Sequence, residues 1–407
     1  MIPHRITALF IAWALPVSSQ AQLPHEASPP PEIRIDADFP GGNITVGSIK
    51  GDTVTLQQDL RDTKEWWFYW YFRVQGAQGR TLTFDFTNGE PIAARGPAVS
   101  LDEGITWKWL GKQPTNKSFT YTFPPTATSV RFSFGMPYTG ANLTNFLSRV
   151  GPHPALKREV LCQSRKNRPV ERLHLGKLVG EPRFRALISA RSHSCEMMAS
   201  YAVEGVIEAV LADDPLGAWF RENVELLVIP FIDKDGVEDG DQGKHRQPHD
   251  HNRDYDEPGL YPETRAIRNF VPGWSAGKLR ASFDLHCPSL RGDANEVIFL
   301  VGSSIPAIQA EQDRFGKILE EVHQGPLPYR KSDNFPFGKG WNTAAGAAGG
   351  TSGSRWAAGL PGIRLATTIE IPYATASKRE VTAESARAFG PDLLRAIRRY
   401  LEETNGL

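Results

Sequence analysis

Two patterns of apolar residues divide the chain. Between residues 33 and about 148, short segments alternate apolar with polar residues and are separated by turn-forming residues. The clearest of these segments are residues 65–76, 80–88, 118–125 and 129–138. Short strands joined by turns are typical of a β-sandwich. We therefore predict an all-β sandwich domain over residues 33–150, with its many aromatic residues packed in the core rather than forming a carbohydrate-binding face.

From about residue 155 the apolar residues form near-continuous runs instead, at residues 184–190, 224–232, 279–286, 295–302 and 363–372. Apolar residues at helical spacing separate most of these runs, at residues 197–212, 262–271, 306–323 and 381–403. Strands that are apolar throughout are buried on both faces of a sheet. The alternation predicts an α/β domain over residues 151–407, with a mixed central sheet flanked by helices.

The first residues form a different kind of segment. Residues 1–21 combine a basic start, an apolar stretch and the small-residue sequence SSQA, which is typical of a cleaved secretory signal peptide. A Pro-rich linker follows at residues 22–32. We expect a secreted or periplasmic protein; the alternative is a disordered leader. No later apolar segment is long enough to span a membrane.

The amino-acid composition limits which kinds of molecule the protein can bind. Of the 407 residues, 40% are apolar and 23% are charged, so most of the chain can fold around a core. Lys plus Arg and Asp plus Glu are equal, at 46 each. This balance argues against a protein that binds nucleic acid through its overall charge.

Polar residues that could bind a metal or take part in catalysis follow the predicted strands. His193 and Glu196 come after the run at 184–190, and His286 ends the run at 279–286. Glu370 lies within the last run. The loop after residues 224–232 carries four more polar candidates, which are Arg246, Asp250, Asn252 and Arg253. Residues beyond strand ends line the ligand crevice of such sheets.

These residue types suit a metal-assisted hydrolysis. His193, Glu196 and His286 would offer zinc two imidazoles and one carboxylate, with one position left for water. Glu370, with apolar neighbours in the chain, would have a raised pKa and could act as the base. Taken singly, each feature has another interpretation. His193 and Glu196 could be a surface or capping pair, and His286 could be a hydrogen-bonded core histidine. Glu370 could be half of a buried ion pair, and the loop with the arginines could be a solvated turn.

Four segments occur in an order that resembles the M14 (funnelin) family of zinc carboxypeptidases, namely HSCE, DHNRDY, FDLHCP and TTIEIPY. The segments EWWFYWYFRVQG, FSFGMPYTGANLTNFL and GTSGSRWAAGLPGI resemble the cytosolic carboxypeptidase subfamily, whose members carry an N-terminal β-sandwich. The resemblance implies one zinc ion per chain, bound by His193, Glu196 and His286, with Glu370 as general base.

The resemblance also implies roles for the remaining candidates. Asn252 and Arg253 would hold the substrate's terminal carboxylate, and Asp250 would orient His193. Arg246 would polarise the scissile carbonyl. The tyrosine that many family members place before the catalytic glutamate is not evident in this chain, so Arg355 would contribute there instead.

Two cysteines, Cys195 and Cys287, adjoin the proposed ligands. They are expected to be buried packing residues, although a disulfide or extra metal ligands are alternatives.

Together these features predict a secreted zinc carboxypeptidase that acts on peptides with a free C-terminal carboxylate. The alternatives are an amidase, a deacylase or a peptidase of cell-wall peptides using the same site, and a non-catalytic protein that binds peptide or glycan.

Overall fold

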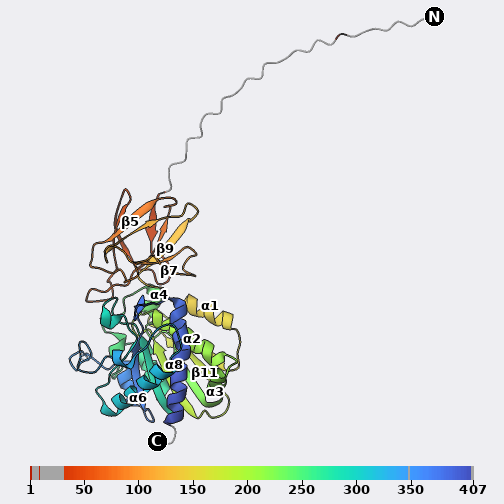
Figure 1. Cartoon of the computed structure of the whole chain (residues 1–407), viewed down its shortest axis with the longest axis vertical. Helices are drawn as coiled ribbons and strands as arrows, with labels where there is room; N and C mark the ends of the chain where they lie inside the picture. The colour runs from red at the N-terminus through yellow and green to blue at the C-terminus, as the bar shows by residue number, and fades with distance from the viewer. Residues whose placement is uncertain (2–8, 10–31, 347–348, 405–407) are drawn as a thin grey trace.

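The structure is a computed structural model that describes residues 32–346 and 349–404, together with the isolated residues 1 and 9. The predicted signal peptide and nearly all of the predicted linker therefore lie outside the described residues. Two regions follow one another along the chain, a β-sandwich and a larger α/β region (Figure 1).

The first region consists of two facing sheets. One contains β1, β4, β9, β6 and β7 in that order, and the other contains β2, β3, β5 and β8. The strands of the first sheet are β1 (Arg34–Asp36), β4 (Tyr71–Gln75), β9 (Ser129–Ser133), β6 (Ala98–Ser100) and β7 (Lys108–Trp109). Those of the second are β2 (Thr45–Lys50), β3 (Thr53–Gln57), β5 (Thr81–Phe86) and β8 (Ser118–Thr122).

Aromatic side chains fill the space between these sheets. Phe72 of β4 lies opposite Phe132 of β9, and Phe84 of β5 lies opposite Phe119 of β8. The rings of Phe72 and Phe84 meet across the two sheets, with centroids 5.5 Å apart. All four, with Trp70, are buried. These aromatic residues are therefore core residues, because burying each large ring removes much apolar surface from water.

Two segments of this region differ from their predicted structure. Residues 65–70 were expected to belong to a strand, but β4 begins only at Tyr71. The Tyr69 N–H donates to the Gln242 side chain, 2.7 Å away, instead of joining a strand ladder. Residues 140–150, expected to continue the β structure, form helix α1 (Gly140–Val150). It begins with a capping box between Thr139 and Asn142, which satisfies free N–H groups at the helix start.

A mixed sheet forms the centre of the second region, with strand order β10, β11, β13, β12, β14, β16 and β15. The four inner strands β13, β12, β14 and β16 run parallel, and the remaining pairings are antiparallel. The strands are β10 (Leu156–Gln163), β11 (Pro169–Gly176), β12 (Phe184–Ala190), β13 (Val224–Ile229), β14 (Leu279–His286), β15 (Phe299–Val301) and β16 (Leu365–Glu370). A short hairpin, β17 (Thr375–Ala376) and β18 (Arg379–Glu380), follows.

Helices cover both faces of this sheet, which explains why its inner strands are apolar throughout. In β13, Leu226 and Val228 join one core cluster, and Leu227 and Ile229 join the other. The first face carries α2 (Met198–Leu211), α3 (Pro215–Asn223), α6 (Pro306–Val322) and α8 (Ala383–Glu403). The second carries α5 (Pro262–Ser275) and α7 (Gly353–Ala357). The remaining helical segments are α4 (Lys234–Asp239), η1 (His251–Arg253), η2 (Asp293–Asn295) and η3 (Lys331–Asp333).

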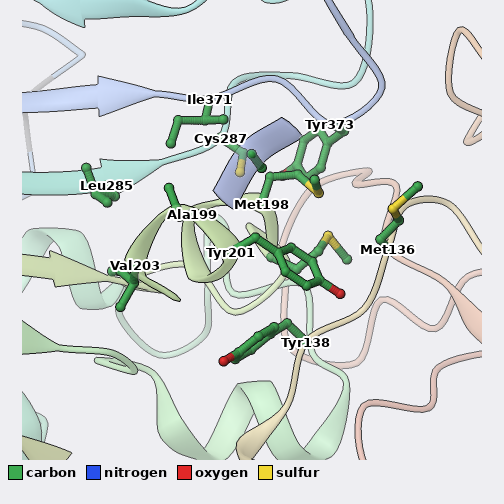
Figure 2. Close-up of a cluster of buried hydrophobic side chains, with 14 of the residues drawn as sticks. Met136, Tyr138, Met198, Ala199, Tyr201, Val203, Leu285, Cys287, Ile371 and Tyr373 are labelled. Atoms are coloured by element: carbon green, nitrogen blue, oxygen red, sulfur yellow. The ribbon is translucent and has the colours of Figure 1, made fainter. Parts of the chain in front are cut away.

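The first turn of α2 anchors the end of the sheet where the polar candidates gather. Met198 packs with Cys287, which follows β14, and with Tyr373, which follows β16 (Figure 2). Tyr201, also from α2, meets Tyr138 with ring centroids 5.0 Å apart. The same apolar cluster thus joins three strand ends and fixes their relative positions. In the described part of the chain, no helix has both the length and the apolar character needed to cross a membrane.

One buried carboxyl group in α5 forms no ion pair with any of the described residues. Glu263 lies in the first turn of α5 and is 2% exposed. Its Oε2 has no hydrogen-bond partner among the described residues. Burial raises the pKa of Glu263 to about 7, and the charges of Asp233 and Asp235 act in the same direction.

Glu263 should therefore make the protein less stable as the pH rises. The unfolded carboxyl releases its proton near pH 4.5, whereas the folded one retains it to about pH 7. The free energy of unfolding contributed by this group falls across that interval, by up to about 3 kcal/mol. In urea unfolding at pH 4.5, 6 and 8, Glu263→Gln should remove this decline, while the exposed Glu402→Gln should behave like wild type. Parallel stability curves for wild type and Glu263→Gln would contradict the assignment.

Candidate metal centre and active site

The turn between β12 and α2 carries His193 and Glu196, and both side chains are buried. Arg191, which was not among the predicted residues, shapes this turn from inside. It has a left-handed φ of 62° and is 2% exposed. Its guanidinium donates to the carbonyl of Ser194, 3.1 Å from Nε, and to that of Tyr138, 3.0 Å from Nη1. A buried donor that satisfies several carbonyls makes the turn rigid.

Three side chains converge at one point. The Nδ1 atom of His193 lies 2.8 Å from Oε1 of Glu196 and 3.2 Å from Nδ1 of His286. The other carboxylate oxygen of Glu196 lies 2.7 Å from Nδ1 of His286. In the described residues, these three form the one group of His, Cys, Asp or Glu side chains whose ligand atoms lie close enough to share an ion.

The chemistry of this group fits zinc. Two imidazole nitrogens and a carboxylate are a common catalytic zinc donor set that leaves a coordination position open. All three side chains are at most 2% exposed, and Oε2 of Glu196 has no partner in hydrogen-bond geometry among the described residues. A cation at their meeting point would satisfy these electron-rich atoms together. His193, Glu196 and His286 could therefore hold one zinc ion.

Two aspartates orient the imidazoles from the far side of each ring. Asp250 Oδ1 lies 3.2 Å from Nε2 of His193. Asp284 Oδ2 lies 2.8 Å from Nε2 of His286, and its Oδ1 accepts from Ser189 Oγ at 2.9 Å. Both carboxylates leave the Nδ1 atoms directed at the common point. Asp284 was not among the predicted residues, although its place two residues before His286 puts both on one side of the strand.

These contacts shift the pKa values of the buried groups. Burial alone would lower the pKa of His286, but Asp284 and Glu196 outweigh it and raise that pKa well above its ordinary value. Burial would raise the pKa of Glu196, but His193 and His286 hold it below its ordinary range. The pKa of Asp250 is lowered in the same way by His193, against the effect of burial. The carboxylates therefore remain ionised and available as ligands or orienting groups.

Glu370 lies next to this group, at the end of β16. It pairs in register with His286 on the adjacent strand β14 and is 6% exposed. Its Oε2 has no hydrogen-bond partner within the described ranges. Burial raises the pKa of Glu370 to about 7, with a further contribution from Glu196, while His286 counters it. A carboxyl group with a pKa near neutrality can both accept and return a proton.

A cavity of about 140 Å³ opens beside these residues and is lined by Asn252, Arg253 and Arg355, together with His193, His286 and Glu370. Asn252 and Arg253 belong to η1, which follows Asp250. The Asn252 side chain accepts from Gly353 N–H at 3.1 Å, and Arg253 donates to carbonyls only, those of Asn252 and Gly346. No acidic side chain in the described residues pairs with Arg253, so its charge can bind a ligand carboxylate. Arg355 reaches the cavity from α7.

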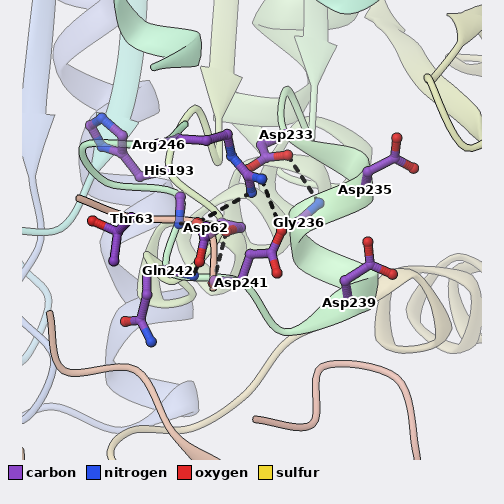
Figure 3. Close-up of polar contacts among 12 residues, drawn as sticks. Asp62, Thr63, His193, Asp233, Asp235, Gly236, Asp239, Asp241, Gln242 and Arg246 are labelled. Carbon is purple, nitrogen blue, oxygen red and sulfur yellow. Dashed lines mark hydrogen bonds and ion pairs between the residues drawn. The ribbon is translucent and has the colours of Figure 1, made fainter. Parts of the chain in front are cut away.

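Arg246 does not reach this cavity, which corrects the expectation drawn from the sequence. Figure 3 shows its guanidinium among three aspartates. Its nitrogens lie 2.5 Å from Asp233, 2.9 Å from Asp241 and 3.7 Å from Asp62. Burial would lower the pKa of Arg246, but these carboxylates raise it. Arg246 is held by a buried ion cluster outside the cavity, so it is not placed to polarise a substrate carbonyl there.

The cysteines beside the ligands are packing residues. Cys195 and Cys287 are both free thiols and are buried. Burial raises the pKa of Cys195 to about 12, so the thiol stays protonated. Neither belongs to the group of side chains that could share a metal ion.

Several of the known proteins that this chain resembles are carboxypeptidases. Residues 35–134 match the family model described as the cytosolic carboxypeptidase N-terminal domain. An uncharacterized protein of Zymomonas mobilis is 26% identical over 295 residues, which cover 69% of this chain and 74% of that protein. Cytosolic carboxypeptidase 4 of Mus musculus is 28% identical over 166 residues, which cover 37% of this chain but only 15% of that enzyme.

Solved structures show the same fold. A metallo-carboxypeptidase from Burkholderia cenocepacia superposes with a TM-score of 0.76 at 23% identity, over 91% of this chain and 100% of that one. A metallo-carboxypeptidase from Pseudomonas aeruginosa, in complex with (2-guanidinoethylmercapto)succinic acid, has a TM-score of 0.74 at 21% identity and covers 91% and 99%. The resemblance to the cytosolic carboxypeptidases and the predicted two-part fold are both confirmed.

Asp284 offers a test of the metal centre that does not remove a ligand. Asp284→Asn should lower zinc affinity by about 10- to 100-fold, because the neutral amide orients His286 less firmly and makes it a weaker donor. Competition with a chelator, on full-length protein checked for folding by circular dichroism, measures this change. The exposed Asp293→Asn is the matched control. Equal affinities for Asp284→Asn and wild type would show that Asp284 does not support a metal ligand.

Proposed function

We propose that this protein is a secreted zinc carboxypeptidase, which hydrolyses the last peptide bond of peptides with a free C-terminal carboxylate. The observation that carries the proposal is the position of Arg253, a cation with no acidic partner in the described residues, in the same cavity as Glu370 and the candidate ligands His193 and His286. A fixed cation at that place selects substrates that end in a carboxylate. The succinic acid derivative bound by the Pseudomonas aeruginosa enzyme supports a carboxylate-bearing substrate.

In this proposal His193, Glu196 and His286 hold the metal. When bound, zinc would act as a Lewis acid that lowers the pKa of a water molecule, so that this water can lose a proton and act as a nucleophile at neutral pH. Arg253 and Asn252 hold the terminal carboxylate of the peptide and so place its last amide bond beside Glu370.

Glu370 then moves the proton. Its carboxylate accepts a proton from the attacking water and returns it to the leaving amine nitrogen as the C–N bond breaks. The raised pKa of Glu370, about 7, suits both transfers, because the group can hold the proton without binding it too tightly.

Hydrolysis of matched peptides tests the proposal. Zinc-loaded protein should cleave peptides with free C-termini and leave the same peptides untouched when they are amidated. Glu370→Gln should retain one zinc ion per chain and lose activity by about 10²- to 10⁴-fold, since glutamine has nearly the same shape but cannot take the proton. Mass spectrometry of the products and metal analysis measure both.

Other outcomes would redirect the assignment. Zinc binding without cleavage of any free C-terminus would favour cell-wall peptides or other amides as substrates. Protein that binds no zinc and cleaves nothing would favour a non-catalytic binding protein.

Export is a separate proposal that rests on residues 1–21, because the basic start, apolar stretch and small residues suit a cleaved leader. Protein expressed with this segment should be recovered outside the cytoplasm with a mature N-terminus near residue 22. N-terminal sequencing after cell fractionation measures this. Uncleaved protein in the cytoplasm would contradict export but leave the catalytic proposal intact.

A further inference from the structure

Lys244 is a further cation of the cavity and was not among the predicted residues. It lines the cavity together with His193, His286 and Glu370. The side chain is half-buried, and no acidic group in the described part of the chain forms an ion pair with it. Its ammonium lies over the ring of Trp67, 5.9 Å from the centroid.

The backbone of the preceding residue explains why Lys244 lies there. Gly243 has a φ of 74°, and a Cβ atom at this position would lie 2.2 Å from the backbone nitrogen of Ser194. The chain can press this closely against the turn that carries His193 only because residue 243 has no side chain. The next residue, Lys244, is consequently held beside the candidate metal ligands.

The β-sandwich fixes this segment from the other side. Asp62, which lies between β3 and β4, accepts hydrogen bonds from the N–H groups of Gln242 at 2.9 Å and Gly243 at 2.8 Å. Two residues after Lys244, Arg246 enters the ion cluster that includes Asp62. Lys244 therefore lies between two anchored positions, and both anchors involve a carboxylate of the N-terminal domain.

We propose that Lys244 is the catalytic residue that polarises the scissile carbonyl, and that Asp62 of the β-sandwich is its positioning residue. This inference rests on the proposed function. As water adds to the carbonyl carbon, the C=O π electrons move onto the oxygen, and an N–H of the Lys244 ammonium donates to that oxygen. The ammonium keeps its proton throughout. When the C–N bond breaks, the electrons return to form the new carboxylate and Glu370 supplies the amine proton.

The chemistry of the alternatives favours Lys244 for this position. Arg246 is surrounded by aspartates, and Arg253 is the cation assigned to the terminal carboxylate. Arg355 also lines the cavity but is exposed, whereas Lys244 is half-buried. A donor directed at developing negative charge stabilises the transition state more than the ground state. Loss of Lys244 should consequently act on kcat rather than on KM.

Lys244→Met and Lys244→Arg, made in the full-length zinc-loaded protein, test the inference. Lys244→Met should lower kcat by about 10²- to 10³-fold with little change in KM or zinc content, and Lys244→Arg should restore part of the loss. The affinity for a peptide phosphonate, measured by calorimetry, should fall with kcat, because the phosphonate resembles the charged transition state. The exposed Lys50→Met is the matched control.

The two proposals fail in distinguishable ways. If wild type cleaves free C-termini and Lys244→Met retains the wild-type kcat and phosphonate affinity, the inference about Lys244 is wrong and the proposed function stands. A rise in KM alone would also overturn it, because Lys244 would then be a binding residue. If wild type neither cleaves peptides nor binds the phosphonate, the proposed function fails and the inference fails with it.

Asp62 is tested through its coupling to Lys244. Asp62→Asn should lower kcat when Lys244 is present and have little further effect on kcat in the Lys244→Met background. Additive losses in the double variant would show that Asp62 supports the fold without positioning Lys244.

Discussion

The charge of Glu196, held away from water between two imidazole rings, is the constraint on which the rest of the site depends. A carboxylate buried without compensation costs several kcal/mol, at least about 3. His193 and His286 compensate it directly, and Asp250 and Asp284 fix the two rings from behind. This arrangement requires three chain segments to end at one place. The parallel order of β12, β14 and β16 meets that requirement, because their carboxyl ends share one edge of the sheet.

The β-sandwich is joined to the site through polar contacts as well as through a shared apolar core, in which Phe68 and Phe134 pack on Tyr373. Asp62 binds the backbone before Lys244 and approaches Arg246, and the Asn43 side chain donates to the Gly240 carbonyl at 2.7 Å. Buried charges of this kind specify one arrangement of the loop, because any other leaves an unpaired charge out of water. The N-terminal domain therefore helps to determine which side chains of the loop face the cavity.

The secondary structure was largely predictable where the apolar residues kept one spacing throughout a segment. Helices α2, α6 and α8 lie within or close to the ranges expected from their apolar spacing, and β12 and β14 coincide with theirs. The two segments that were predicted wrongly have one feature in common: side chains, rather than a strand ladder, bind their backbone. Residues 65–70 have the composition of a strand, but the Gln242 side chain takes the backbone hydrogen bonds of Tyr69. Helix α1 begins at a capping box whose polar residues also suit a turn.

The sequence alone determined which residue types stand at the ends of the inner strands. It thereby identified His193, Glu196, His286 and Glu370, because apolar runs followed by polar residues reveal the crevice edge of such a sheet. Only the tertiary structure decided which cation of the following loop faces that crevice. Lys244 and Arg246 are two residues apart on one polar segment, so periodicity and charge could not separate them. Asp62, distant in sequence, draws Arg246 into an ion cluster, and the close approach of Gly243 leaves Lys244 beside the candidate metal ligands His193 and His286.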